Sequence, residues 1–159
     1  MTRWPLRLEP VLRPLMQAHW RLSRGMTLGV RGLASDPDGK IALVRHTYMA
    51  GWHLPGGGVE RGETLLQAIG KEMREEAGVA LTARPHLFHI YANDRNFRGD
   101  HIALFIVRDW TPCPPEPGRE IAETGWFAPD AIPADTSPAT RERIAEVLDT
   151  RPPADLWSL

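Results

Sequence analysis

The sequence is poor in several features that would place it in a particular class of protein. It has one cysteine, Cys113, which excludes an internal disulfide framework and suits a reducing compartment, so we expect a cytoplasmic protein. With 19 basic and 20 acidic residues, the formal net charge is −1, and no overall basic field points to a nucleic acid polymer as partner. No apolar run approaches the roughly 20 residues of a membrane-spanning helix, so we expect no stable membrane insertion.

What the chain does have is the composition of an ordinary globular domain. Its 159 residues are 42% hydrophobic and 25% charged, which is enough for one domain with a real core. The first 25 residues are basic and rich in proline, and the apolar spacing over residues 8–22 predicts a helical extension. We expect this extension to pack on the domain or on a second subunit, which would make a homodimer, rather than to lie on an anionic membrane surface.

Strand and helix patterns alternate along the rest of the chain. The strands are expected at residues 26–34, 40–46, 85–91, 100–110 and 125–128, and the helices at 63–77 and 138–148. The turn at 35–39 should join the first two strands as a hairpin, and the segment TPCPPEPG after residue 110 is too rich in proline to continue a strand. This order indicates one layered α/β domain over residues 26–150, followed by an extended tail at 151–159 in which Leu156 and Trp157 are available to pack.

The stretch from Gly56 to Val79, GGGVERGETLLQAIGKEMREEAGV, combines a glycine loop with an acidic helix. One stripe of that helix is apolar and predicts its core face: Leu66, Ile69, Met73 and Ala77. Glu72, Glu75 and Glu76 fall together on a neighbouring arc, where their like charges repel. A divalent cation such as Mg²⁺ or Mn²⁺ would offset the repulsion, because clustered carboxylate oxygens are the ligands that it prefers. A solvated acidic face is the alternative interpretation.

The glycines at 56–58 permit a close approach of the backbone, so that carbonyls can join a metal site and amides can meet phosphate. Counted from Gly57, the pattern is G-x5-E-x7-K-E-M-x-E-E-x-G-V, which closely resembles the Nudix box, G-x5-E-x7-R-E-U-x-E-E-x-G-U with U aliphatic. The flanking segments WHLPGGGVERGE and EIAETGWFAPDAIP also look like those of Nudix domains. The resemblance implies an α/β/α sandwich with a mixed β-sheet, and a metal-dependent hydrolase that cleaves a nucleoside diphosphate linked to a moiety X.

The resemblance also implies roles for individual residues. Glu72 and Glu76 would ligate the metal, and Glu75 would ligate it or hold a metal-bound water; all three count as catalytic. The Gly56 carbonyl would be a further ligand, and the amides of Gly57 and Gly58 would meet phosphate. The general base differs between family members. Among the carboxylates that follow the box, Glu120 is the best candidate for the base, ahead of Glu116 and Glu123. The alternative interpretation is that Glu120 is a solvated acid in a loop.

One position departs from the family pattern, because Lys71 stands where the family has arginine. Lysine keeps the charge but lacks the planar fork that orients a box glutamate. The match to the box implies a structural role for Glu63, which would pair with Lys71 or support the loop.

Substrate contacts outside the box are less constrained. Arg45 ends a strand shortly before the catalytic loop and could meet a phosphate, although a surface arginine explains it nearly as well. Trp52 and Tyr48 could stack on a base or sugar, but core or loop packing is the preferred interpretation for Trp52. The loop at 95–98 could border the pocket or form a plain turn.

Two other functions remain open. A Nudix-like sensor would bind a nucleotide derivative without cleaving it, and the departure at Lys71 is its only support. A Nudix-like isomerase of isoprenoid diphosphates would need a catalytic cysteine, for which Cys113 among prolines is a poor candidate. A small nucleotide derivative is the expected partner of the hydrolase and of the sensor.

Overall fold

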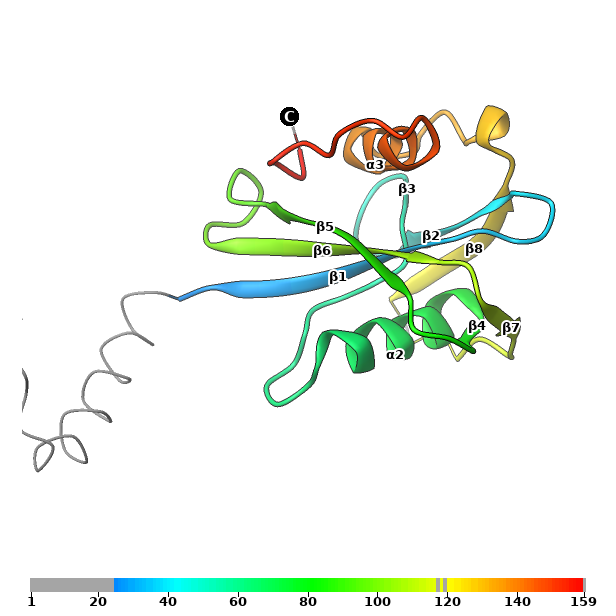
Figure 1. Cartoon of the computed structure of the whole chain (residues 1–159), viewed down its shortest axis with the longest axis horizontal. Helices are drawn as coiled ribbons and strands as arrows, with labels where there is room; N and C mark the ends of the chain where they lie inside the picture. The colour runs from blue at the N-terminus through cyan, green and yellow to red at the C-terminus, as the bar shows by residue number, and fades with distance from the viewer. Residues whose placement is uncertain (1–24, 117, 119, 159) are drawn as a thin grey trace, which may run out of the picture.

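The computed structural model describes residues 25–116, 118 and 120–158, so the helix predicted at 8–22 lies outside the described residues. The described chain forms β-sheets that lie between helix α2 on one side and helix α3 on the other (Figure 1). The strands are β1 (Thr27–Ala34), β2 (Ile41–His46), β3 (Trp52–His53), β4 (Val79–Leu81), β5 (His86–Ala92), β6 (Asp100–Val107), β7 (Trp110–Pro112) and β8 (Ile121–Phe127). The helices are α2 (Leu65–Ala77), a short 3-10 helix at Pro129–Ala131, and α3 (Pro138–Leu148).

The strand pairing confirms a mixed sheet but contradicts the predicted hairpin. In one sheet, β1 runs parallel to β6 along its whole length and β5 is antiparallel to β6; in another, β2 pairs with β3 and β8. The turn between β1 and β2 makes one bridge, Ser35 to Ile41, and no ladder. The reason is that residues 55–59 lie along the edge of β1 that faces away from β6. There the N–H of Val30 donates to the Gly57 carbonyl at 2.9 Å. That edge is therefore not available to β2.

The two faces of the sheets carry two separate cores, because successive strand residues point to opposite sides. In β6, Ala103, Phe105 and Val107 join the core on the α2 side, while Ile102 and Leu104 join the core on the α3 side. The α2 side also holds the buried helix residues Ile69, Met73 and Ala77, which confirms the predicted core stripe, with Leu66 partly buried against it. Strands buried on both faces explain why the apolar runs of β2 and β6 show little polar alternation.

Helix α2 begins two residues later than predicted and ends where predicted. Thr64 is its N-cap and forms a capping box with Gln67, so residues 63–64 lie outside the helix. Gly78 adopts the left-handed conformation with φ 64°, and its N–H donates to the carbonyl of Arg74 at 3.2 Å, which ends the helix. The two caps fix the length of the helix and hence the position of its acidic face.

Other elements differ from the prediction at their edges. The strand expected over 100–110 breaks after Val107, and Trp110–Pro112 forms β7 against β4, so the start of the proline-rich segment does pair. Pro112 is tolerated because β7 is an edge strand. Helix α3 has the predicted bounds, and in the tail Trp157 is buried against the α3-side core. Within the described residues, no helix has both the length and the apolarity to cross a bilayer.

Candidate active site

In the glycine loop at 55–58, Gly56 packs against β1 more closely than a residue with a side chain would allow. Gly56 has φ 142°, and a Cβ at this position would collide with the carbonyl oxygen of Val30. A Cβ on Gly57 would come within 2.9 Å of the Glu72 carboxylate carbon. The glycines therefore bring backbone amides and carbonyls directly against the acidic face of α2.

Glu76 is the most enclosed carboxylate of that face. Its side chain accepts a hydrogen bond from the Gly56 N–H at 2.8 Å, and the residue is 9% exposed. Burial raises the pKa of Glu76 to about 7, with further upward contributions from Glu72 and Glu120, while the Gly56 N–H and Arg31 act in the opposite direction. Burial also raises the pKa of Glu72, with Glu75 adding to it. Carboxylates of this kind gain from a nearby cation.

Lys71 holds Glu72 by charge. Its Nζ lies 3.3 Å from a Glu63 carboxylate oxygen, 3.6 Å from one of Glu72 and 3.8 Å from one of Glu60. Burial lowers the pKa of Lys71, but these three carboxylates outweigh it, and the net shift is upward. The expected Glu63–Lys71 pair is thus present. The lysine reaches the box glutamate as a shared point charge instead of a two-pronged fork.

The expectation that all three box glutamates converge on one point is not met. Within the described residues, no three His, Cys, Asp or Glu side chains are gathered closely enough to hold a metal ion. One reason is that the carboxylates have separate partners: Glu76 bonds to the Gly56 N–H, and Glu72 lies beside Lys71. The pair Glu72 and Glu76 still fits a magnesium ion, because Mg²⁺ keeps several waters and is usually held by one or two carboxylates together with substrate phosphates.

Arg31 is a residue of this site that the sequence analysis missed. It lies in β1, and its guanidinium donates to the carbonyl of Gly56. Burial lowers the pKa of Arg31, while Glu76, Tyr48 and Glu72 raise it, so the arginine faces the same carboxylates. The available signal was a lone arginine in the middle of the apolar strand TLGVRGLA, since a charge in a strand of this kind needs a specific partner.

Arg45, the predicted phosphate contact, has other partners. Its Nη2 lies 2.8 Å from Asp135, its Nε lies 4.0 Å from Glu123, and its guanidinium covers the Trp52 ring at 5.0 Å. Trp52 is buried and packs edge-on against Phe127, as the packing interpretation expected. A role of Arg45 in substrate binding stays a prediction, whereas Arg31 already lies at the glycine loop.

Glu120 directly precedes β8 and interacts electrostatically with Glu76 of the acidic face. It is exposed, and its carbonyl accepts from the Thr47 N–H at 2.8 Å, which fixes the chain next to the β2–β3 loop. The Glu120 carboxylate contributes to the raised pKa values of both Glu76 and Tyr48. The later loop therefore brings this candidate base close to the acidic face of α2.

A cavity of about 650 Å³ adjoins the site on the α3 side. Arg31 lies at its wall, and so do the β3 residue His53 and Asn96 from the loop at 95–98, for which both a place beside the pocket and a plain turn had been open. Further parts of the wall come from Ile102 of β6, from the start of α3, and from Trp157 and Ser158 of the tail. Its volume lies in the range of small-molecule sites, roughly 300–1,000 Å³. Cys113 follows β7, beside Gly78, and is not among the lining residues.

The comparisons with known proteins agree with this architecture. The sequence profile of the NUDIX domain matches residues 25–148, and the chain belongs to the Nudix family. A MutT-like protein of Streptomyces ambofaciens is 28% identical over 130 residues, which cover 79% of this chain and 73% of that protein. An ADP-ribose pyrophosphatase of Methanocaldococcus jannaschii is 28% identical over 117 residues, which cover 72% of this chain and 69% of that protein.

Solved structures confirm the Nudix-type α/β fold. The MutT NUDIX hydrolase from Burkholderia pseudomallei superimposes with a TM-score of 0.64 at 25% identity, covering 76% of this chain and 97% of that one. A NUDIX hydrolase from Nitrosomonas europaea gives 0.64 at 22% identity, covering 79% and 90%. At the level of the family, the expected Nudix-type hydrolase of phosphoanhydride bonds is confirmed, and Nudix hydrolases generally use divalent metal ions.

Proposed function

We propose that the protein is a metal-dependent pyrophosphohydrolase that cleaves the diphosphate linkage of a nucleoside diphosphate joined to a moiety X, with water as the nucleophile. The observation that carries this proposal is the placement of Glu72 and Glu76, partly or wholly buried, against the backbone of Gly56 and Gly57. Two desolvated carboxylates beside a glycine loop are costly unless they serve a cation. We assign the function to residues 26–150, with residues 151–159 as a tail.

The donor set indicates which residues would hold the ion. Carboxylate oxygens of Glu72 and Glu76 and the Gly56 carbonyl are the hard ligands that Mg²⁺ or Mn²⁺ takes, and Glu75 would ligate the ion or hold a metal-bound water. When bound, the ion would neutralise phosphate charge and lower the pKa of a coordinated water. Lys71 keeps Glu72 in position, and Glu120 is the proposed acceptor of the proton that the attacking water releases.

These groups account for every bond and proton that changes in the reaction. The water oxygen forms a bond to one phosphorus, the bridging P–O bond of the anhydride breaks, and the water proton passes to the base. We propose that Arg31, which bonds to the Gly56 carbonyl, compensates negative charge on the diphosphate. The products are two phosphate monoesters, one on the nucleoside and one on X.

A product assay and a calorimetric binding measurement together distinguish a hydrolase from a protein that only binds the nucleotide. Purified protein is assayed for phosphate-ester products with ADP-ribose, UDP-glucose and ATP in the presence of Mg²⁺ or Mn²⁺, as wild type, Glu76→Gln and Asp130→Asn. We expect turnover by the wild type and the exposed control Asp130→Asn, and a loss of at least a hundredfold in Glu76→Gln. Calorimetric binding without turnover in all three proteins would instead identify a nucleotide sensor. Absence of both metal and nucleotide binding would refute the proposal.

A further inference from the structure

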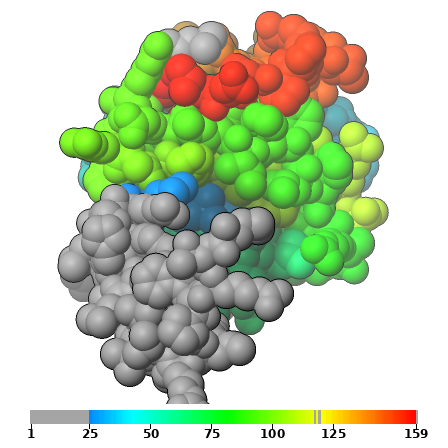
Figure 2. All heavy atoms as spheres, turned by 60° about the vertical axis from the view of Figure 1, so that its left-hand side comes forward, coloured from blue at the N-terminus to red at the C-terminus, as the bar shows by residue number. Residues whose placement is uncertain are grey.

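The C-terminal residues 154–158 form a strap that closes one side of the cavity. In Figure 2 these residues lie on the surface beside the segment that contains β5. The Ala92 N–H donates to the Asp155 carbonyl at 2.9 Å, and the Trp157 N–H donates to the Ala92 carbonyl at 2.9 Å. The strap therefore extends the β5 edge of the sheet instead of ending freely in solvent.

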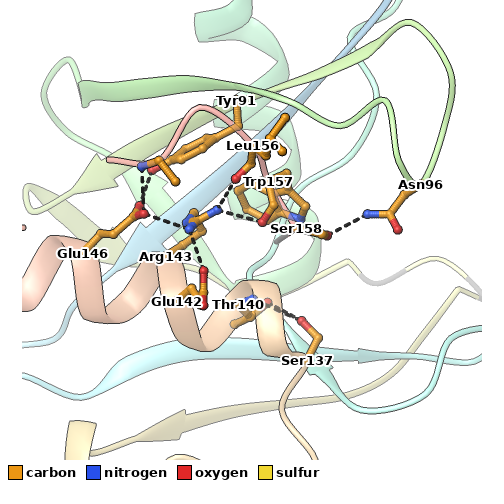
Figure 3. Close-up of polar contacts among 11 residues, drawn as sticks. Tyr91, Asn96, Ser137, Thr140, Glu142, Arg143, Glu146, Leu156, Trp157 and Ser158 are labelled. Atoms are coloured by element: carbon orange, nitrogen blue, oxygen red, sulfur yellow. Dashed lines mark hydrogen bonds and ion pairs between the residues drawn. The ribbon is translucent and has the colours of Figure 1, made fainter. Parts of the chain in front are cut away.

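A buried arginine fixes the strap from the other side. Arg143 of α3 is 0% exposed, and its Nη1 donates to the carbonyls of Leu156 at 2.8 Å and Trp157 at 2.7 Å (Figure 3). Its Nη2 donates to Glu146 at 2.8 Å, and Glu146 also accepts the Ala154 N–H at 2.9 Å. Burying a guanidinium is costly unless its partners compensate it, so this arrangement gives the strap one position.

That position places two side chains of the strap at the cavity wall. Trp157 and Ser158 line the cavity, and the hydroxyl of Ser158 accepts a hydrogen bond from the Asn96 amide at 2.7 Å (Figure 3). The same amide nitrogen of Asn96 donates to the Asn93 side chain at 2.8 Å. Both amide hydrogens of Asn96 are then used, which leaves its carbonyl oxygen to accept and the Ser158 hydroxyl hydrogen to donate.

The charges around the cavity restrict what it can take. Among the described lining residues, Arg31 is the only side chain that is cationic at neutral pH, since burial lowers the pKa of His53. The lining carboxylate of Glu142 lies 3.1 Å from Arg143 and is paired. Away from Arg31 the wall is neutral, with apolar surface from Ile102 and Trp157. A second phosphate would find no cation there, whereas a neutral ring with hydroxyl groups matches both the amide and the apolar surface.

We propose that this cavity is the subsite for a hydroxylated sugar ring joined to the diphosphate, and that the strap at residues 154–158 forms its specificity-determining wall. The inference rests on the proposed function, because Arg31 connects the two: it lines the cavity and bonds to Gly56 at the glycine loop. A diphosphate held at the carboxylates would pass Arg31, with its sugar in the cavity. That sugar is either the ribose of the nucleoside or the sugar of X.

The two sources are distinguished by two comparisons of ligands. ADP-ribose against the β-methyl ester of ADP reports on the sugar of X, and ADP-ribose against its 2′-deoxyadenosine analogue reports on the nucleoside ribose. Each ligand is measured by its KM with wild-type protein and by its Kd, using calorimetry, with Glu76→Gln as the background. The variants are Ser158→Ala and Asn96→Ala, and the control is Asp155→Asn, an exposed position in the same strap.

We expect Ser158→Ala and Asn96→Ala each to reduce the preference for the sugar-bearing ligand by about three- to tenfold in one of the two comparisons, as for the loss of one hydrogen bond. Asp155→Asn should leave both ratios unchanged, and thermal unfolding should show that all variants are folded. Unchanged ratios in both comparisons, from folded variants, would overturn the subsite. A strap-dependent Kd without any turnover would support the subsite and refute the proposed hydrolase.

Discussion

The buried guanidinium of Arg143 offers a quantitative test of how the tail is held. The change is Arg143→Met, which keeps the length and most of the volume of the side chain but removes its charge and all its donors. Arg143 bonds to two tail carbonyls and to Glu146, at 2.7 to 2.8 Å, and has no exposed surface. Its removal leaves Glu146 as a buried carboxylate without its cation.

The expected cost follows from that uncompensated charge. Removing one partner of a buried ion pair costs about 3–5 kcal/mol, which is a large part of the ~5–15 kcal/mol that stabilises a domain. Each kcal/mol lowers the melting temperature of a chain of this size by roughly 2–4 °C, so a fall of about 6–20 °C is expected. Urea unfolding followed by tryptophan fluorescence and thermal unfolding followed by circular dichroism measure the two quantities.

Two further variants show whether the loss of stability comes from the buried ion pair. Arg151→Met removes an exposed pair, in which Arg151 lies 3.3 Å from Asp149, and should cost no more than ~1 kcal/mol. The double variant Arg143→Met with Glu146→Leu removes both charges and should cost clearly less than the sum of the two single changes. A loss below ~1 kcal/mol for Arg143→Met, or additive losses in the double variant, would show that the buried pair does not hold the tail.

Three other predictions concern the site and its surroundings. Gly56→Ala should abolish phosphate-ester release and lower the melting temperature, because its Cβ would displace the loop from β1; a fully active variant would contradict the close packing. Lys71→Arg should keep the rate of hydrolysis within about threefold of wild type, whereas Lys71→Met should lose at least tenfold, because Glu72 needs a positive neighbour. Equal steady-state rates for Lys71→Met and wild type would show that Lys71 does not position Glu72. Burial lowers the pKa of His46 to about 4, so the unfolded chain takes up the proton first as the pH falls. His46 alone should therefore lower the free energy of unfolding by about 2 kcal/mol between pH 7 and pH 5, while the raised pKa of Glu76 acts in the opposite direction in wild type and variant alike. In urea titrations at both pH values, the change in the free energy of unfolding from pH 7 to pH 5 should be about 2 kcal/mol more favourable in His46→Leu than in wild type, and an identical change would refute the prediction.

Local sequence signals predicted the elements whose ends are set by their own residues. Helix α3 has the predicted bounds because Ser137 caps it and Pro138 occupies its first turn. Helix α2 ends at Gly78 for an equally local reason. The acidic face of α2 and its glycine loop were also visible in the sequence, because both belong to one contiguous stretch.

Strand partners were less predictable, because they depend on segments far apart in the chain. The turn after Ala34 has ordinary hairpin chemistry, yet β1 pairs with β6, and residues 55–59 cover its other edge. Nothing in the residues of β1 specifies these partners. Arg31 was missed for the same reason: its role depends on Gly56, which is 25 positions away and meets it only once the loop lies along β1.

The backbone of Gly56 connects the two halves of the site, the acidic face of α2 and the cavity. Its N–H donates to Glu76 and its carbonyl accepts from Arg31, so the two peptide groups that flank its Cα lie between the acidic face of α2 and the cavity. A carbonyl oxygen has two lone pairs, and acceptance from Arg31 leaves one for a cation. A ligand that draws Arg31 towards its phosphate would therefore change the electron density and orientation of this carbonyl. Binding of the sugar diphosphate and metal affinity at the carboxylates should consequently be coupled, and the coupling should be weaker in Arg31→Met.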